Sequence, residues 1–227
     1  MAVFDSIAER FDRWFDEDGR EIFLEEVRCL NSVFPEFTRG IEIGLGSGRF
    51  SVEIGIPIGI DPSMELLKMA KNRGIVSICG KGEQLPFKPN SFDLVLLNTT
   101  LCFVSNPEKV LNEAKRVLVP DGHIVLGIIN RESKVGREYQ KKGETGHSVY
   151  SHARLFSEEE AVELLKKTGF TLIDVCRAIK ADNSYAFIAM VFRKDEKLTN
   201  KRSCLSLSKM RRRDEEDKNS EECVCCQ

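Results

Sequence analysis

The chain has 227 residues, of which 41% are hydrophobic and 31% are charged, as is typical of a globular protein that buries its own core. Its formal net charge of −2 excludes the strong basic field that attracts nucleic acid or anionic membranes. No apolar run approaches the roughly 20 residues that span a bilayer, and the N-terminus lacks a signal-peptide layout, so we expect a cytoplasmic protein.

The spacing of apolar residues near the N-terminus predicts two amphipathic helices. Between Phe4 and Phe15 these residues recur at helical intervals. A second helix is predicted near residues 20–34, and Pro35 ends it. We therefore expect residues 1–35 to form a helical N-terminal cap.

Strands and helices then alternate along the chain. Helices are predicted near residues 48–54, 62–74, 106–118 and 157–169, and strands at residues 40–44, 57–61, 75–79, 91–98, 123–130, 170–179 and 184–192. Such alternation is typical of a mostly parallel sheet with helices on both faces, and the last two strands suggest an antiparallel hairpin at one edge. The predicted fold class is a doubly wound α/β sheet of seven strands.

Two segments stand apart from this alternation. Residues 131–156 are polar, have no clear period and are too long for an ordinary connection, so we interpret them as a loop on the substrate side. Residues 194–227 carry dense charges of both signs and few apolar residues, which predicts a disordered tail. The predicted main domain therefore covers residues 1–193.

The eight cysteines form two groups. Four lie singly in apolar stretches and are expected to be small, reduced core residues in a reducing compartment: Cys29, Cys79, Cys102 and Cys176. The other four lie in the predicted tail: Cys204, Cys223, Cys225 and Cys226.

Residues 41–50, IEIGLGSGRF, have a glycine at every second position. Gly44, Gly46 and Gly48 follow the first predicted strand and precede a helix, which is where open α/β sheets bind ligands. Bare backbone at a helix start offers N–H groups to a polar ligand. A dinucleotide site would need G-x-G-x-x-G, but Arg49 occupies the place of its third glycine.

Four motifs in order resemble those of class I S-adenosylmethionine (SAM)-dependent methyltransferases, and most closely the type 11 branch with the ubiquinone and menaquinone methylases. The motifs are EIGLGSG, GIDPSMELLKMAK, GEQLPFKPNSFDLVLLN and EAKRVLVPDGHIVL, within residues 38–130. The resemblance implies a Rossmann-like methyltransferase fold with N-terminal lid helices. It also implies S-adenosyl-L-methionine as the cofactor.

The resemblance further implies which residues bind the cofactor. The three glycines would lie against its methionine moiety, with Glu42 on the amino-group side. Asp61 would accept hydrogen bonds from both ribose hydroxyls, because the two oxygens of a carboxylate suit a vicinal diol. The other implied cofactor-binding residues follow the second strand, lie in the loop GKGEQLPF or end the fourth strand: Pro62, Ser63, Met64, Gly82, Glu83 and Asn98.

Lys81 departs from the family pattern, in which an aspartate at this position accepts a hydrogen bond from the adenine amino group. A lysine ammonium has no acceptor, so this contact is expected to be missing. Backbone groups of Gly82 and Glu83 would replace it, with weaker cofactor affinity as the result.

Methyl transfer from a sulfonium is an in-line displacement, for which the protein mainly supplies alignment and excludes water. We expect a small-molecule acceptor, with no nucleic acid and no metal ion. The expected substrate-side residues are Trp14, Phe15, Arg131 and Arg137, and the candidates for a base or an orienting group are Tyr139, Tyr150 and His152. Arginines and tyrosines in this segment suit an acidic or aromatic acceptor.

Three other functions remain open at this point. An NAD-dependent dehydrogenase of the Tyr-x-x-x-Lys type is disfavoured, because Gly143 follows Tyr139 and Arg154 follows Tyr150 at that spacing. A SAM-binding module without catalysis fits the same motifs. A thiol or metalloid methyltransferase would use the Cys-x-Cys-Cys stretch at 223–226, since cysteine thiolates bind soft metals.

Overall fold

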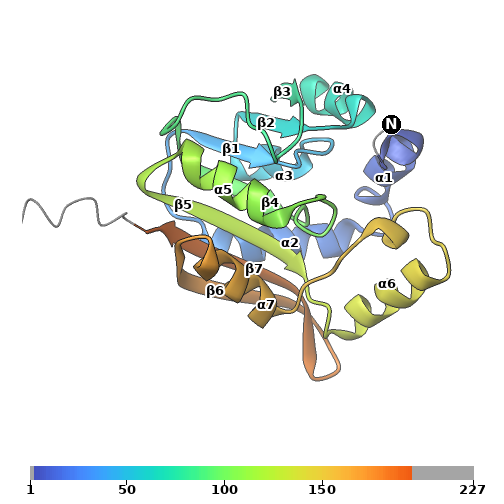
Figure 1. Cartoon of the computed structure of the whole chain (residues 1–227). Coiled ribbons are helices and arrows are strands. Elements are labelled where there is room, and N and C mark those ends of the chain that lie inside the picture. Colours follow the sequence, from blue (N-terminus) through green and yellow to red (C-terminus); the bar gives the residue numbers. More distant parts are fainter. Residues whose placement is uncertain (1–2, 196–227) are drawn as a thin grey trace, which may run out of the picture. The chain divides into compact units, whose positions relative to one another are not determined.

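The computed structural model describes residues 3–195 (Figure 1). The helices of this part of the chain are η1 (Asp5–Ile7), α1 (Ala8–Trp14), α2 (Arg20–Val33), α3 (Arg49–Ile54), α4 (Met64–Asn72), α5 (Pro107–Val117), α6 (Lys134–Glu144), η2 (Tyr150–His152) and α7 (Glu158–Lys167). The strands are β1 (Gly40–Ile43), β2 (Ile58–Asp61), β3 (Val76–Cys79), β4 (Phe92–Asn98), β5 (Leu118–Ile129), β6 (Phe170–Ala181) and β7 (Ser184–Lys194).

The seven strands form one sheet in the order β3-β2-β1-β4-β5-β7-β6. The pairs among β1 to β5 are parallel, whereas β7 pairs antiparallel with both β5 and β6. The predicted fold class, a mostly parallel seven-stranded sheet with an antiparallel hairpin at one edge, is therefore confirmed. Within residues 3–195 no helix is long and apolar enough to cross a membrane.

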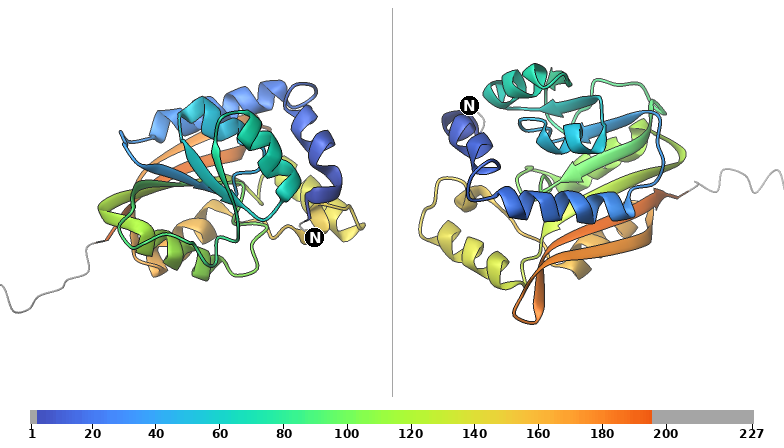
Figure 2. Two further views of the ribbon diagram at one scale, coloured as in Figure 1. Left: turned by 90° about the horizontal axis from the view of Figure 1, so that it is seen from above. Right: turned by 180° about the vertical axis from the view of Figure 1, so that it is seen from behind.

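Helices cover both faces of the sheet, and the alternation of side chains along β4 shows which helix covers which face. Val95 and Leu97 share a core cluster with residues of α5 and α7, whereas Leu94 and Leu96 share another with Leu30 of α2. Because successive strand residues point to opposite faces, α5 and α7 lie on one face and α2 on the other (Figures 1 and 2).

Several helices begin at the capping residues that the sequence contains. The Ser63 hydroxyl accepts a hydrogen bond from the Leu66 N–H at the start of α4. Ser157 and Glu160 form a reciprocal capping box at the start of α7. Asn106 caps α5, so these helix starts are fixed by local chemistry.

The carboxyl ends of β1, β2, β4 and β5 point to the same side of the sheet, as the arrowheads in Figure 1 show. We call this boundary of the sheet, formed by strand ends rather than by an outer strand, the ligand edge. The N-terminal segment η1–α1 and the segment α6–η2 both lie beyond this edge (Figures 1 and 2). Ligands of open α/β sheets bind at such an edge. The fold therefore places two chain segments beside the expected ligand site.

Residues 131–156, which we expected to be a loop, contain a helix. Ser133 caps the start of helix α6, and its hydroxyl accepts a hydrogen bond from the Gly136 N–H at 2.9 Å. Gly136 is its sole buried residue, so α6 has no apolar stripe from which the sequence would reveal it. The two tyrosines of the segment, Tyr139 and Tyr150, stack with ring centroids 4.2 Å apart.

Two other expectations are corrected by the structure. Cys29 of α2 and Cys176 of β6 form a disulfide, with Cα atoms 5.6 Å apart, so neither is reduced as expected. Cys79 is a free cysteine but is exposed, so it does not belong to the core. Strand β5 starts at Leu118 rather than His123, and a bulge separates these two residues. The four C-terminal cysteines lie outside the described residues.

Candidate functional site

The glycine turn after β1 needs backbone that side chains rarely allow. Gly44, Gly46 and Gly48 have φ angles of +81°, +56° and +80°, in the left-handed region that favours glycine. A Cβ on Gly44 would collide with the Thr100 side chain, whereas a Cβ on Gly46 would meet nothing within 4 Å. The turn is therefore packed against the end of β4 at Gly44 and open to a ligand at Gly46.

Asp61 ends β2 beside this turn and is 8% exposed. Its Oδ2 accepts a hydrogen bond from the Gly46 N–H at 2.9 Å, and its Oδ1 accepts one from the Ser63 N–H at 2.8 Å. Burial raises the pKa of Asp61, and these two bonds oppose the shift. Each oxygen keeps lone-pair capacity, so the carboxylate fits a ligand with two neighbouring hydroxyls, as the ribose of SAM has.

Glu42 lies in the middle of β1, on the face toward α3, and is 2% exposed. The Ser51 hydroxyl donates a hydrogen bond to its Oε2 at 2.5 Å. Burial raises the pKa of Glu42 to about 8, and the charge of Asp61 contributes to the rise. A cationic group nearby would favour the ionised carboxylate, as the amino group of a bound methionine moiety would.

Ser63, Pro62 and Met64 follow Asp61 and begin α4. The Ser63 side chain is buried and donates a hydrogen bond to Oδ1 of Asp5 at 2.6 Å, which links α4 to the N-terminal segment. Pro62 and Met64 are exposed on the same turn.

The loop after β3 contains the next expected contacts. Gly82 is buried, and a Cβ there would lie 2.8 Å from Ile43, so the loop packs closely on β1. The Glu83 carboxylate accepts hydrogen bonds from the backbone N–H groups of Ser105 and Asn106 at 3.0 and 3.4 Å. Its side chain therefore holds the start of α5, while Lys81 is exposed.

Asn98 ends β4 and is 4% exposed. Within the part of the chain that the structure describes, neither its amide nitrogen nor its amide oxygen has a hydrogen-bond partner. Buried polar groups in folded proteins are nearly always paired, so an unpaired one needs a reason. A ligand group at this edge of the sheet would supply the partner.

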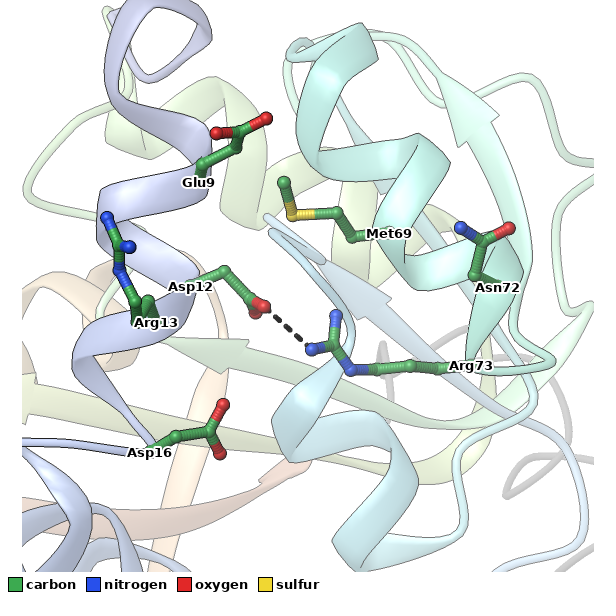
Figure 3. Close-up of a pocket in the computed structure, with 7 residues that line it drawn as sticks. All are labelled: Glu9, Asp12, Arg13, Asp16, Met69, Asn72 and Arg73. Carbon is green, nitrogen blue, oxygen red and sulfur yellow. Dashed lines mark hydrogen bonds and ion pairs between the residues drawn. The ribbon is translucent and has the colours of Figure 1, made fainter.

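An ion-pair network that the sequence did not reveal ties the N-terminal segment to the glycine turn. Arg49, directly after Gly48, donates through Nε to Asp12 at 2.7 Å and through Nη2 to Asp16 at 2.6 Å. Arg73, directly after the last residue of α4, donates a hydrogen bond to Asp12 at 2.8 Å. Figure 3 shows Asp12 and Arg73 meeting at a pocket of about 400 Å³ between α1 and α4.

We expect Arg49→Ala to lower the free energy of unfolding by about 1–3 kcal/mol, because the half-buried Asp12 would retain only Arg73 and Ser47 as partners. Burial opposes the ionisation of Asp12, but hydrogen bonds from arginine outweigh it and hold its pKa well below 3.8. This stabilisation is present above the pKa of the unfolded state and is lost as the pH falls through the folded pKa. Urea unfolding of both proteins from neutral to acidic pH should therefore show the difference shrinking.

Arg13→Ala is the matched control for this prediction. Arg13 lies on the same helix, and its nearest contact with Glu17 is a 3.8 Å pair between side chains that are 64% and 62% exposed. Removing it should change the unfolding free energy by less than about 0.5 kcal/mol. An equal loss in the two variants would show that the Arg49 network contributes nothing specific.

The expected substrate-side aromatic residues differ in their surroundings. Phe15 is buried and packs edge-on against Phe23 and Phe50, with centroids 5.4 and 5.9 Å apart, so it belongs to the core between α1, α2 and α3. Trp14 covers Gly19, where a Cβ would collide with the indole ring. The ring of Phe15 is therefore enclosed by other aromatic rings, and its place in the wall of an acceptor pocket stays a prediction.

The expected arginines and base candidates lie in or near α6 and η2. Arg131 pairs with Glu160 at 2.7 Å, and Arg137 donates to the backbone carbonyl of Glu132. Burial raises the pKa of Tyr150, and the contact with Tyr139 adds to the rise. His152 is exposed in η2.

Comparison with known proteins agrees with this fold. The family model of a methyltransferase domain matches residues 41–126. An uncharacterized protein of Methanocaldococcus jannaschii is 45% identical over 179 residues, which are 79% of this chain and 86% of that protein. An uncharacterized protein of Mycobacterium tuberculosis is 34% identical over 73% of this chain, which spans 59% of that relative.

A crystal structure from Thermotoga maritima has a TM-score of 0.80 and 37% identity to this chain, and the match covers 85% of this chain and 99% of that one. That protein is described as a SAM-dependent methyltransferase and a possible histamine N-methyltransferase. The fold and the similarity together define the class: a methyltransferase. The chain belongs to the class I SAM-dependent methyltransferases, in the type 11 branch, and is thus an enzyme with S-adenosyl-L-methionine as its cofactor.

Proposed function

We propose that this enzyme transfers the methyl group of SAM to a small-molecule acceptor, with S-adenosylhomocysteine (SAH) as the second product. The observation that carries the proposal is the carboxylate of Asp61, which two backbone N–H groups orient beside the open backbone of Gly46. When bound, SAM would supply an activated methyl group whose carbon is attacked by an acceptor lone pair as the carbon–sulfur bond breaks and SAH leaves.

The residues at the carboxyl ends of β1 and β2 would hold this cofactor. Asp61 would accept the ribose hydroxyls, the backbone at Gly46 would allow close approach, and Glu42 would pair with the amino group. Pro62 and Met64 would flank the nucleoside, while Gly82 and the Glu83 backbone would face the adenine. These roles require no side chain to act as a nucleophile, because the acceptor attacks the methyl carbon directly.

Two segments lie beyond the strand ends, where a small acceptor would bind next to the cofactor. The N-terminal segment is held there by the Arg49 network and by the edge-on contact of Phe4 with Phe103, whose centroids are 5.1 Å apart. The segment α6–η2 lies beyond the same edge (Figure 1). The raised pKa of Tyr150 keeps its phenol protonated, so Tyr150 would orient an acceptor rather than accept its proton. Tyr139 stays a candidate for a base or an orienting group. His152 stays a candidate base.

The test is product formation with methyl-deuterated SAM, detected by mass spectrometry. Because the Thermotoga maritima relative is described as a possible histamine N-methyltransferase, histamine is the first acceptor to try, followed by mixtures of small metabolites. We expect SAH to form only when a small molecule is added, with one labelled methyl group on that molecule. SAH formation with protein or RNA fractions alone would contradict the proposal. If the enzyme instead used the cysteines at 223–226 to methylate a thiol or a metalloid, the labelled methyl group would appear on the thiol sulfur or on the metalloid.

A further inference from the structure

Two polar side chains lie buried beneath α2, and the cofactor contacts proposed above do not need them. Glu26 of α2 is 6% exposed, and Asn98 at the end of β4 is 4% exposed. Within residues 3–195 neither the Glu26 carboxylate nor the Asn98 amide has a hydrogen-bond partner. Both therefore have unused hydrogen-bonding capacity, with the Asn98 amide fully enclosed and the Glu26 side chain almost so.

Strand alternation places Asn98 on the face of the sheet that α2 covers. Leu94, Leu96 and Asn98 point to one side of β4, and the two leucines pack in one cluster with Leu30 of α2. Glu26 precedes Leu30 by one helical turn, so it lies on the same face of α2.

The direction of α2 brings the two polar groups toward the same edge. The N-terminal end of α2 lies beside α1, at the carboxyl ends of the strands (Figure 2, right). Glu26 is closer to this edge than Leu30, and Asn98 is closer to it than Leu96. The two side chains therefore face the same end of the layer between α2 and the sheet, which is the ligand edge.

The surroundings of Gly127 show where the Asn98 amide points. A Cβ on Gly127 of β5 would overlap Asn98 Oδ1 and would lie 2.9 Å from Cζ of Phe187 on β7. Phe187 belongs to the cluster that α2 covers, and α2 packs across β5, β7 and β6. The amide thus extends over β5 toward the strands beneath α2, away from the glycine turn on the other side of β4.

An apolar residue at either position would fold more easily. Burying an unpaired amide or carboxyl group is unfavourable, and burial raises the pKa of Glu26 to about 8. Residues that lower stability in this way are typical of ligand-binding sites, where the ligand completes the hydrogen bonds.

We propose that Glu26 and Asn98 bind the methyl acceptor and that this acceptor carries an amine. The proposal rests on the proposed transfer to a small molecule and names the chemical class of that molecule. A cationic ammonium beside Glu26 would favour the ionised carboxylate, which only accepts the hydrogen bonds that such a ligand donates. The amide of Asn98 both donates and accepts. Asn98 is assigned here to the acceptor instead of the cofactor.

The charges around the site favour an amine over an acid. A cationic acceptor would favour the ionised form of Glu26, whereas the arginines expected to bind an anionic acceptor already have partners in Glu160 and a backbone carbonyl. An acceptor amine would donate a hydrogen bond to Glu26, while its neutral nitrogen or another nucleophilic atom of the molecule attacks the methyl carbon with its lone pair and the carbon–sulfur bond breaks to release SAH. Any proton released on transfer passes to solvent.

The experiment compares three matched sets of acceptors in a SAH-formation assay on the full chain. The amines are histamine, tyramine and tryptamine, and their counterparts carry a carboxylate or a hydroxyl in place of the amine. We expect turnover of at least one amine at a rate at least about tenfold above its two counterparts. Faster turnover of an acid or an alcohol would overturn the amine assignment but leave the proposed methyl transfer standing. Turnover of none would count against both.

Variants of α2 separate a binding role from a structural one. Glu26→Gln is expected to lower kcat/KM for the preferred amine by about 100-fold, while the affinity for SAH, measured calorimetrically, changes less than about twofold. Glu26→Leu should lose activity equally, yet unfold at a higher temperature than wild type. Glu25→Gln, at the exposed neighbouring position, is the matched control and should change neither quantity. Full activity in Glu26→Leu, or an equal loss of SAH affinity, would overturn the proposal.

Discussion

Asp61→Ala is expected to weaken the binding of SAH by about 100-fold or more while the protein stays folded. The wild-type carboxylate would accept two hydrogen bonds from the ribose, and a hydrogen bond to a charged group contributes about 1.5–3 kcal/mol. Calorimetric titration with SAH measures the loss directly. NADH serves as the control ligand and should not bind either protein.

Asp61 also holds the N–H groups of Gly46 and Ser63, so its removal disturbs the turn as well as the ligand contact. A SAH analogue without the ribose hydroxyls separates the two effects. It should bind the wild-type protein about as weakly as SAH binds the variant, and the variant should not distinguish the two ligands. If the variant still bound the analogue more weakly than SAH, by the same factor as the wild-type protein does, Asp61 would not contact the ribose hydroxyls and would only support the turn.

Gly46→Ala should abolish SAH binding at a small cost in stability. Its φ of +56° adds about 1–2 kcal/mol of strain, but the new methyl group meets no protein atom within 4 Å. The methyl group would instead occupy the space that the ligand needs, so we expect at least about 100-fold weaker binding. Gly44→Ala should chiefly destabilise the fold, because its Cβ collides with Thr100.

Gly55→Ala provides the control for backbone strain. Gly55 has a φ of +84° and open space around its Cβ position, but it lies at the end of α3, away from the turn. Its variant should lose a similar amount of stability in urea unfolding and bind SAH normally. Normal SAH binding by Gly46→Ala would mean that the cofactor does not approach the turn at this glycine.

The N-terminal segment connects these effects to the stability of the cap. Asp5 accepts a hydrogen bond from Ser63, whose own N–H holds Asp61, and the charge of Asp5 contributes to the raised pKa of Asp61. The cap and the proposed ribose site therefore share one hydrogen-bonded chain. A change in the cap is expected to alter cofactor affinity as well as stability.

The sequence alone determined the fold class and the family of this protein. Strand and helix periods, helix caps such as Ser157 and Glu160, and the glycine turn with Asp61 are all contained in short stretches of chain. Each is set by interactions among near neighbours, such as a hydroxyl with an N–H three residues on. Patterns of this kind are visible without knowing how distant segments meet.

Only the tertiary structure decided which distant residues meet. Asp12 pairs with Arg49 and Arg73, 37 and 61 residues further on, and Cys29 bonds to Cys176 across 147 residues. In the sequence Glu26 resembles any other polar residue of an amphipathic helix, and its burial results from the packing of α2 on the sheet. Burial and long-range pairing arise from the packing of whole elements, which local periodicity does not encode.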